Sequence, residues 1–195
     1  MIQDIALITF AYLLGSVSSG VIVCKIMFSR DPRNEGSKNF GATNVRRICG
    51  NIAGALTLAG DMLKGIIPML VAHALHYPNI APTWLLISVG MAAFFGHLYP
   101  IWFNFKGGKG VATALGVQLG LHWIFGGTLV VIWLVIAKIG HISSLAALIS
   151  MALAPIIIWL ILPSYELLVM QITMSILIFW QHRSNIQRLM NGTEK

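Results

Sequence analysis

Long apolar stretches separated by short polar loops constrain this chain more than any other feature. The stretches with few charged residues are 5–27, 53–75, 84–103, 111–137, 144–162 and 167–180. A helix that crosses a bilayer needs about 20 mostly apolar residues, and its backbone must satisfy its own hydrogen bonds. The pattern therefore predicts an all-α, polytopic membrane helix bundle. We expect residues 1–195 to form a single integral membrane domain.

Basic residues predict the topology of that bundle. Among 13 Lys and Arg against 6 Asp and Glu, most lie in loop 28–50, loop 104–110 and the tail 181–195. Basic loops face the cytoplasm, and all of these can do so only if 111–137 is two short helices broken near 120–123. That arrangement has about seven transmembrane segments, with the N-terminus outside and the C-terminus cytoplasmic. Placed in short loops, this charge indicates topology and anion binding, and no nucleic-acid partner is expected.

The first basic loop contains the sequence GSKNFGATNVRR, residues 36–47. Gly36 and Gly41 permit positive φ, so their neighbouring backbone N–H groups can converge on an anion. Arg47 can hold a phosphate through two parallel hydrogen bonds. Neutral hydrogen-bonding side chains accompany them: Ser37, Asn39, Thr43 and Asn44. The loop is predicted to bind substrate phosphate; the alternative is a solvated loop that only obeys the positive-inside rule.

The second basic loop reads KGGKG at residues 106–110, just before a predicted helix. Two ammonium groups beside exposed backbone amides suit a phosphate, so Lys106, Gly107, Gly108 and Lys109 are predicted phosphate ligands. The sequence does not match the Walker A pattern, which argues against nucleotide hydrolysis.

The tail carries the sequence QHRSNIQRL, residues 181–189. If it is helical, His182, Asn185 and Arg188 share one face at spacings of three residues. Ser144 begins an apolar segment, where a hydroxyl can also meet phosphate. These four side chains are predicted to contribute to the site, the alternatives being a snorkelling basic helix end and a simple helix cap.

Two ionisable residues lie inside the second apolar stretch. Asp61 and Lys64 are three residues apart on a predicted helix, and charged groups inside a membrane usually pair or line a site. We expect them, with His97 of the next stretch, to support the pocket structurally. Cys24 and Cys49 are expected to act as apolar residues. No His, Cys, Asp or Glu set has metal-ligand spacing and no GxSxG elbow occurs, so we predict no metal and no cofactor.

These motifs together resemble the bacterial acyl-phosphate:glycerol-3-phosphate acyltransferases, integral membrane enzymes of phospholipid biosynthesis. The resemblance covers nearly the whole chain. It rests on LGS at 14–16, GSKNFGATNVRR, DxxKG at 61–65, GHLYP at 96–100 followed by FKGGKG, and the closing HRSNIQRL. Lys38 is one departure, because the family usually has Gly at this position.

The resemblance implies transfer of an acyl group from acyl phosphate to the sn-1 hydroxyl of glycerol 3-phosphate, giving lysophosphatidic acid and phosphate. It implies an enzyme of the bacterial inner membrane, and the one-sided basic loops place the active site on the cytoplasmic face. We predict catalytic roles for Ser37, His182 and Asn185. For His182 we favour orientation of glycerol 3-phosphate over general-base action. The soluble-type HxxxxD motif is absent, since neither His97 nor His182 is followed by Asp five residues later.

Two other classes of protein could use a basic, glycine-rich membrane chain. An organophosphate or anion transporter would place such elements near the bilayer midplane, often in inverted repeats, and no repeat is evident here. A non-catalytic subunit that binds anionic lipid would need the charge but not the His–Asn–Arg face. The oligomeric state does not follow from the sequence.

Overall fold

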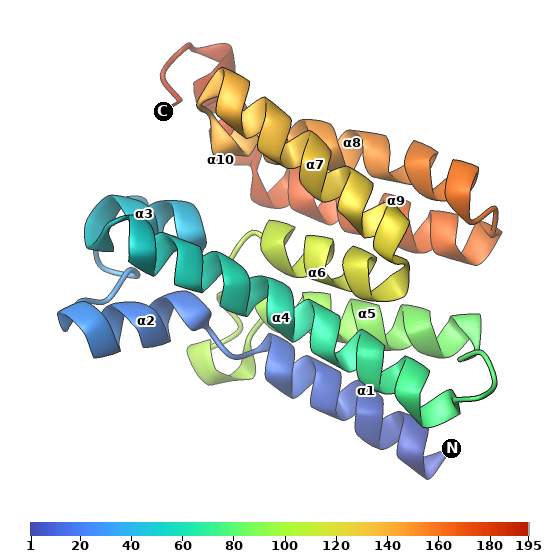
Figure 1. The fold of residues 1–195 in the computed structure, drawn as a ribbon. Coiled ribbons are helices and arrows are strands. Elements are labelled where there is room, and N and C mark those ends of the chain that lie inside the picture. Colours follow the sequence, from blue (N-terminus) through green and yellow to red (C-terminus); the bar gives the residue numbers. More distant parts are fainter. Residues whose placement is uncertain (195) are drawn as a thin grey trace. The chain divides into compact units, whose positions relative to one another are not determined.

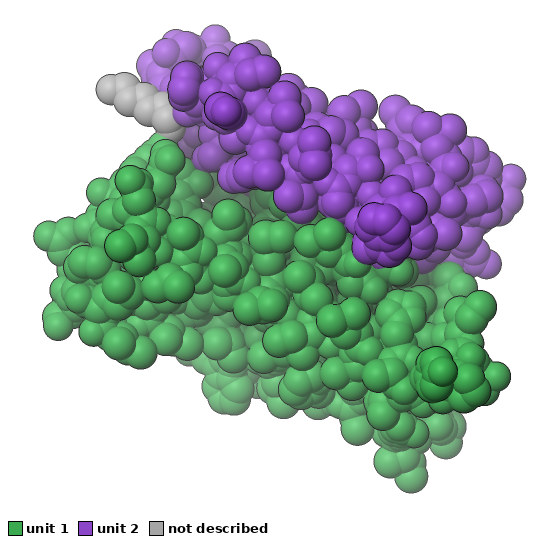
Figure 2. Space-filling model, viewed as in Figure 1, with its two compact units in different colours: residues 1–121 green, residues 122–195 purple. Residues whose placement is uncertain are grey.

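The computed structural model describes residues 1–194, and these form ten α-helices and one short 3-10 helix with no strand. The chain divides into two compact units, Met1–Leu121 and His122–Lys195 (Figure 1, Figure 2). Four helices of the described chain are long and apolar enough to cross a membrane, or five if one bent pair counts as a span. The all-α membrane architecture is therefore confirmed, while the single-domain assignment stays a prediction.

The first unit contains seven helical elements. They are α1 (Ile2–Gly15), α2 (Ser19–Phe28), α3 (Ala42–Cys49), α4 (Asn51–His76), α5 (Thr83–Leu98), the 3-10 helix η1 (Ile101–Phe103) and α6 (Val111–Leu121). The second unit contains α7 (Trp123–Gly140), α8 (Ser143–Ile161), α9 (Tyr165–Gln181) and α10 (Arg183–Met190).

Helix α4 is the centre of the first unit, in contact with α1, α2, α3, α5 and α6 (Figure 1). Its approach to α6 depends on two glycines. A Cβ on Gly65 would overlap the carbonyl oxygen of Thr113, and a Cβ on Gly116 would overlap that of Met62. Small residues at a helix–helix contact let the backbones come close, which is the main source of packing between membrane helices.

The predicted first span, 5–27, is broken in the structure. Helices α1 and α2 meet at an angle of 43° across residues 16–18. The Ser16 hydroxyl donates back to the Tyr12 carbonyl (2.9 Å), and the Ser18 hydroxyl accepts from the Val21 N–H (3.4 Å), so one serine ends α1 and the other caps α2. Serine side chains that bond to nearby backbone compete with the continuing helix, and the apolar pattern alone did not show this.

The stretch 111–137 is also broken, at the position that the basic loops required. His122 is extended between α6 and α7, and its Nδ1 accepts from the N–H of Phe125 at 3.5 Å. The predicted break near 120–123 is therefore confirmed. Helices α6 and α9 are shorter than a full span, so the count of seven membrane segments stays a prediction.

Candidate functional site

In the first unit, Asn44 organises the loop that precedes α3. Its Oδ1 accepts from the N–H of Ser37 (2.9 Å), and its Nδ2 lies 3.0 Å from the Pro32 carbonyl and 2.9 Å from that of Asn39. The side chain is buried. Because all three partners lie in the loop, we expect Asn44 to fix the shape of that loop rather than to bind a substrate directly.

Positive φ is predicted for both Gly36 and Gly41, and only Gly36 has it. Gly36 has φ +59°, as predicted, but Gly41 has an ordinary φ of −78° and is the N-cap residue of α3. The second left-handed residue of the loop is Lys38, at φ +58°, where the family that this chain resembles usually has Gly. The family's preference for Gly has a steric reason, because a Cβ is unfavourable in this conformation.

The two basic loops of the first unit are joined by an aromatic contact. The rings of Phe40 and Phe103 meet edge to face with 5.7 Å between centroids. The Arg33 guanidinium lies 5.2 Å above the Phe103 ring, and its Nε and Nη2 donate hydrogen bonds to the Asp31 carboxylate. The side-chain hydrogen bond from Arg33 lowers the pKa of Asp31 to about 2. Arg33 therefore ties the loops together, which its sequence position did not reveal.

The glycine-rich loop 106–110 rests on His97. The N–H of Gly108 donates to the His97 carbonyl at 3.1 Å. Behind His97, Lys64 Nζ lies 3.0 Å from Asp61 Oδ1, so the predicted intramembrane pair forms. Lys106 is exposed and Lys109 is half-buried. The structure thus places the KGGKG loop, the GSKN loop and the Asp61–Lys64 pair in one unit.

In the second unit, Glu194 draws three predicted site residues together. Its carboxylate accepts from Ser144 Oγ (2.8 Å), Asn185 Nδ2 (2.5 Å) and Arg188 Nε (2.5 Å). Burial favours a higher pKa for Glu194, but the hydrogen bonds from Arg188, Asn185 and Ser144 outweigh it, and the pKa is lowered. A carboxylate held by this set shows that these side chains can hold an anionic group.

His182 lies beside that cluster, at the start of α10. Its Nδ1 is 2.8 Å from the carbonyl oxygen of Ile178, and the side chain is buried. A carbonyl only accepts, so Nδ1 carries the proton in the neutral ring and Nε2 is the acceptor nitrogen. The ring is therefore held in the tautomer that can accept a hydrogen bond from a hydroxyl.

Sequence reasoning missed Glu194. The available signal was composition, because Glu194 is the one acidic residue of the basic tail 181–195. It comes six residues after Arg188, and a turn at Gly192, with φ +66°, returns the chain toward α10. The turn brings Glu194 back to Arg188, so the two charges pair.

The sequence is similar to known glycerol-3-phosphate acyltransferases. A family model described as glycerol-3-phosphate acyltransferase matches residues 5–192. The chain is 52% identical to a glycerol-3-phosphate acyltransferase of Methylococcus capsulatus, over 96% of this chain and 93% of that protein. The corresponding protein of Hydrogenovibrio crunogenus is 50% identical, over 98% of this chain and 90% of the relative.

Solved structures agree. The crystal structure of PlsY, an integral membrane glycerol 3-phosphate acyltransferase in its glycerol 3-phosphate form, superposes with a TM-score of 0.91 at 39% identity, covering 99% of this chain and 94% of that one. Its lysophosphatidic acid form gives a TM-score of 0.88 at 37% identity, with the same coverage. With the motifs in these positions, the chain belongs to the glycerol-3-phosphate acyltransferase family, integral membrane enzymes with an acyltransferase role in phospholipid biosynthesis.

Proposed function

We propose that this protein transfers a fatty acyl group from acyl phosphate to the sn-1 hydroxyl of glycerol 3-phosphate, giving lysophosphatidic acid and inorganic phosphate. The observation that carries the proposal is the contact between Phe40 and Phe103, which joins two basic, glycine-rich loops in one unit. Both substrates bear phosphate, and these loops offer backbone amides, Arg47, Lys106 and Lys109 to it. The crystal structure of the similar protein PlsY is a glycerol 3-phosphate form, which supports glycerol 3-phosphate as the acyl acceptor.

The chemistry needs no covalent enzyme intermediate. The glycerol 3-phosphate oxygen attacks the acyl carbonyl carbon, the bond between that carbon and the phosphate oxygen breaks, and phosphate leaves. Acyl phosphate is already an activated mixed anhydride, so positioning and charge stabilisation can supply most of the acceleration. The electron pair of the broken bond goes to the departing phosphate, and cationic loops stabilise the negative charge that this phosphate gains.

We propose catalytic roles for Ser37 in the first unit and for His182 and Asn185 in the second unit. The acceptor nitrogen of His182 suits a hydrogen bond from the glycerol 3-phosphate hydroxyl. We favour an orienting role, in which the phosphate oxygen of the donor takes the hydroxyl proton. General-base action by His182 is the alternative, and a substitution series separates the two roles.

We also propose that the protein lies in the bacterial inner membrane, with seven membrane segments and the active site on the cytoplasmic face. The positive-inside distribution of Lys and Arg supports this orientation. The interruption at His122, which splits 111–137 into α6 and α7, supports the segment count.

Release of phosphate by the purified protein tests the proposal. Acyl phosphate and glycerol 3-phosphate together should yield phosphate and lysophosphatidic acid, while either substrate alone should not. Acyl-CoA and acyl carrier protein serve as alternative donors in parallel reactions. Acyl transfer from either of these but not from acyl phosphate would refute acyl phosphate as the donor. No acyl transfer from any of the three donors would favour a transporter or a lipid-binding subunit.

A further inference from the structure

Three ionisable side chains meet inside the first unit. Asp61 Oδ1 lies 3.0 Å from Lys64 Nζ on the same helix and 3.9 Å from His97 Nδ1 on α5. The Asp61 and Lys64 side chains are 4% exposed and that of His97 is 6% exposed. Charges are expensive at this depth and are usually retained for a purpose. We call these residues the buried triad.

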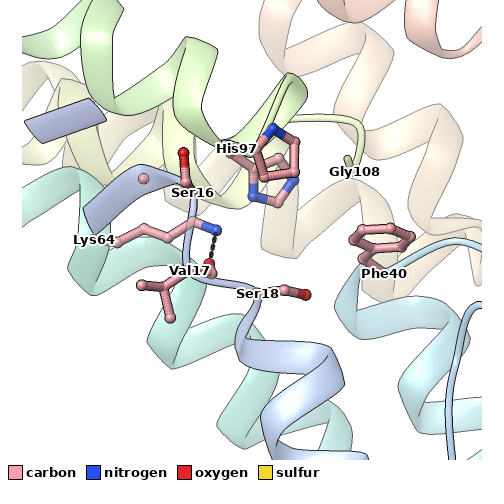
Figure 3. A pocket seen from close by; sticks show the side chains of 9 residues that line it. Ser16, Val17, Ser18, Phe40, Lys64, His97 and Gly108 are labelled. Carbon is pink, nitrogen blue, oxygen red and sulfur yellow. Dashed lines mark hydrogen bonds between the residues drawn. The ribbon is translucent and has the colours of Figure 1, made fainter. Parts of the chain in front are cut away.

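Lys64 connects the buried triad to the break between α1 and α2. Its Nζ donates to the carbonyl oxygen of Val17 at 2.8 Å, across the break in the first span (Figure 3). The Ser19 side chain, in the first turn of α2, bonds to Asp61. An unwound backbone carbonyl in a membrane protein needs such a partner, so the triad holds the break in place.

A small cavity lies beside this contact. It measures about 10 Å³, roughly the room of one water molecule, and its lining includes Ser16, Ser18, Lys64, His97 and Gly108 (Figure 3). The cavity is too small for a substrate. The imidazole of His97 lies between Lys64 and Gly108 in this view, so His97 links the buried charges to the glycine-rich loop.

The glycine-rich loop is packed onto His97 without spare space. Its Gly108 N–H donates to the His97 carbonyl (3.1 Å), and a Cβ on Gly107 would overlap that same carbonyl oxygen. A Cβ on Gly108 would overlap Nε2 of the imidazole and lie 2.9 Å from its Cε1. His97 therefore fixes the positions of both glycines of KGGK. Its backbone carbonyl packs against Gly107, and its imidazole ring packs against Gly108.

We propose that His97, held by Asp61 and Lys64, is a positioning residue for the glycine-rich loop. It determines where Gly107 and Gly108 lie, and therefore how the backbone presents Lys106 and Lys109 to the phosphate of glycerol 3-phosphate. The inference rests on the proposed function in one respect, that this loop binds that phosphate. His97 acts through the loop and does not touch the substrate.

Direct binding of glycerol 3-phosphate, measured by calorimetry on purified protein, tests the proposal together with steady-state kinetics. His97→Ala should raise both the Kd and the KM for glycerol 3-phosphate about tenfold, which corresponds to about 1.4 kcal/mol, with kcat within about twofold. His97→Gln keeps a polar side chain of similar length and is the second variant if His97→Ala does not fold. His76→Ala, in the same unit at the end of α4, is the matched control and should leave KM unchanged.

A double-mutant cycle separates positioning from general destabilisation. Gly108→Ala should raise KM about tenfold or more in the wild-type background, because the added methyl meets the imidazole. In the His97→Ala background the same methyl finds space, so its further effect should be under about threefold.

Equal effects of Gly108→Ala in both backgrounds, or an unchanged KM in His97→Ala and His97→Gln, would overturn the positioning role while leaving the proposed function intact. Failure of the wild-type protein to bind glycerol 3-phosphate would overturn both.

Discussion

The Nε of Arg188 lies 2.5 Å from a carboxylate oxygen of Glu194, and this contact closes the C-terminal tail onto α10. The Glu194 side chain is 6% exposed and that of Arg188 is 43% exposed. A charge-assisted bond of this kind, partly screened on the arginine side, contributes about 1–2 kcal/mol. The same carboxylate bonds to Ser144 and Asn185, so one residue organises the predicted polar cluster of the second unit.

Glu194→Gln should loosen this cluster. The amide keeps the size of the side chain but loses the charge that attracts Arg188, so the free energy of unfolding should fall by about 1–2 kcal/mol. A lower thermal midpoint and faster proteolysis of the tail would report the loss. Glu166→Gln changes an exposed glutamate of the same unit and serves as the control. A Glu194→Gln protein with wild-type midpoint and tail proteolysis would contradict the assignment.

Acid should have the same effect as that substitution. Because the folded-state pKa of Glu194 is lowered from 4.5, the carboxylate stabilises the fold fully above pH 4.5 and loses this contribution as the pH falls through the lowered value. Pepsin cleavage of the tail should therefore increase at acid pH in the wild-type protein. Glu194→Gln should show a flatter dependence, and an identical acid response in both proteins would exclude Glu194 as its source.

Lys38→Gly should stabilise the first loop. Lys38 has φ +58°, a conformation that costs an L-residue about 1 kcal/mol and glycine much less. Lys38→Ala removes the charge but keeps the unfavourable conformation, so it is the matched control. We expect a higher thermal midpoint for Lys38→Gly than for Lys38→Ala. Equal midpoints would mean that the backbone at residue 38 carries no strain.

Lys109→Ala and Arg47→Ala should each reduce kcat/KM about a hundredfold or more, since each removes a charged donor from substrate phosphate. Arg47→Lys should also be poor, because a single ammonium cannot form the two parallel bonds of a guanidinium. Lys138→Ala, at an exposed position in the second unit, should be near wild type. Near-normal kinetics in both alanine variants, with folded protein, would remove the phosphate assignment.

His182→Gln distinguishes orientation from proton transfer. If His182 orients glycerol 3-phosphate, Gln can still form a hydrogen bond, so turnover at saturating substrate should remain measurable while KM for glycerol 3-phosphate rises. A general base would instead leave the variant almost inactive and would place an imidazole ionisation in the wild-type pH–rate profile. An inactive variant with normal glycerol 3-phosphate binding would favour the general base.

Cysteine labelling in intact cells tests the topology. In a background with Cys24 and Cys49 replaced by Ala, single cysteines at the exposed positions Lys38, Lys106 and Gln187 should react only with reagents that reach the cytoplasm. A cysteine at the exposed position Asn79 should react from outside. Labelling of position 187 from outside would eliminate the seven-segment arrangement.

The sequence alone determined the features that depend on neighbouring residues along the chain, namely the helices, the break at His122 and the polar face of α10. Apolar length predicted the membrane helices, because a helix satisfies its backbone within one segment. The one-sided basic loops predicted the interruption found at His122. The three-residue spacing of His182, Asn185 and Arg188 predicted their neighbourhood at α10, because helical neighbours follow from spacing alone.

Tertiary structure decided how distant segments use those residues. Asn44 is a predicted phosphate ligand, but its amide bonds to the backbone of the loop that precedes its helix. Lys64 pairs with Asp61 as spacing suggested, yet its bond to the Val17 carbonyl exists only because α4 packs beside the broken first span. His97 meets Gly108 for the same kind of reason. Sequence periodicity encodes contacts within one helix, whereas contacts between segments depend on how closely their backbones approach, which small residues such as Gly65 and Gly116 set in three dimensions.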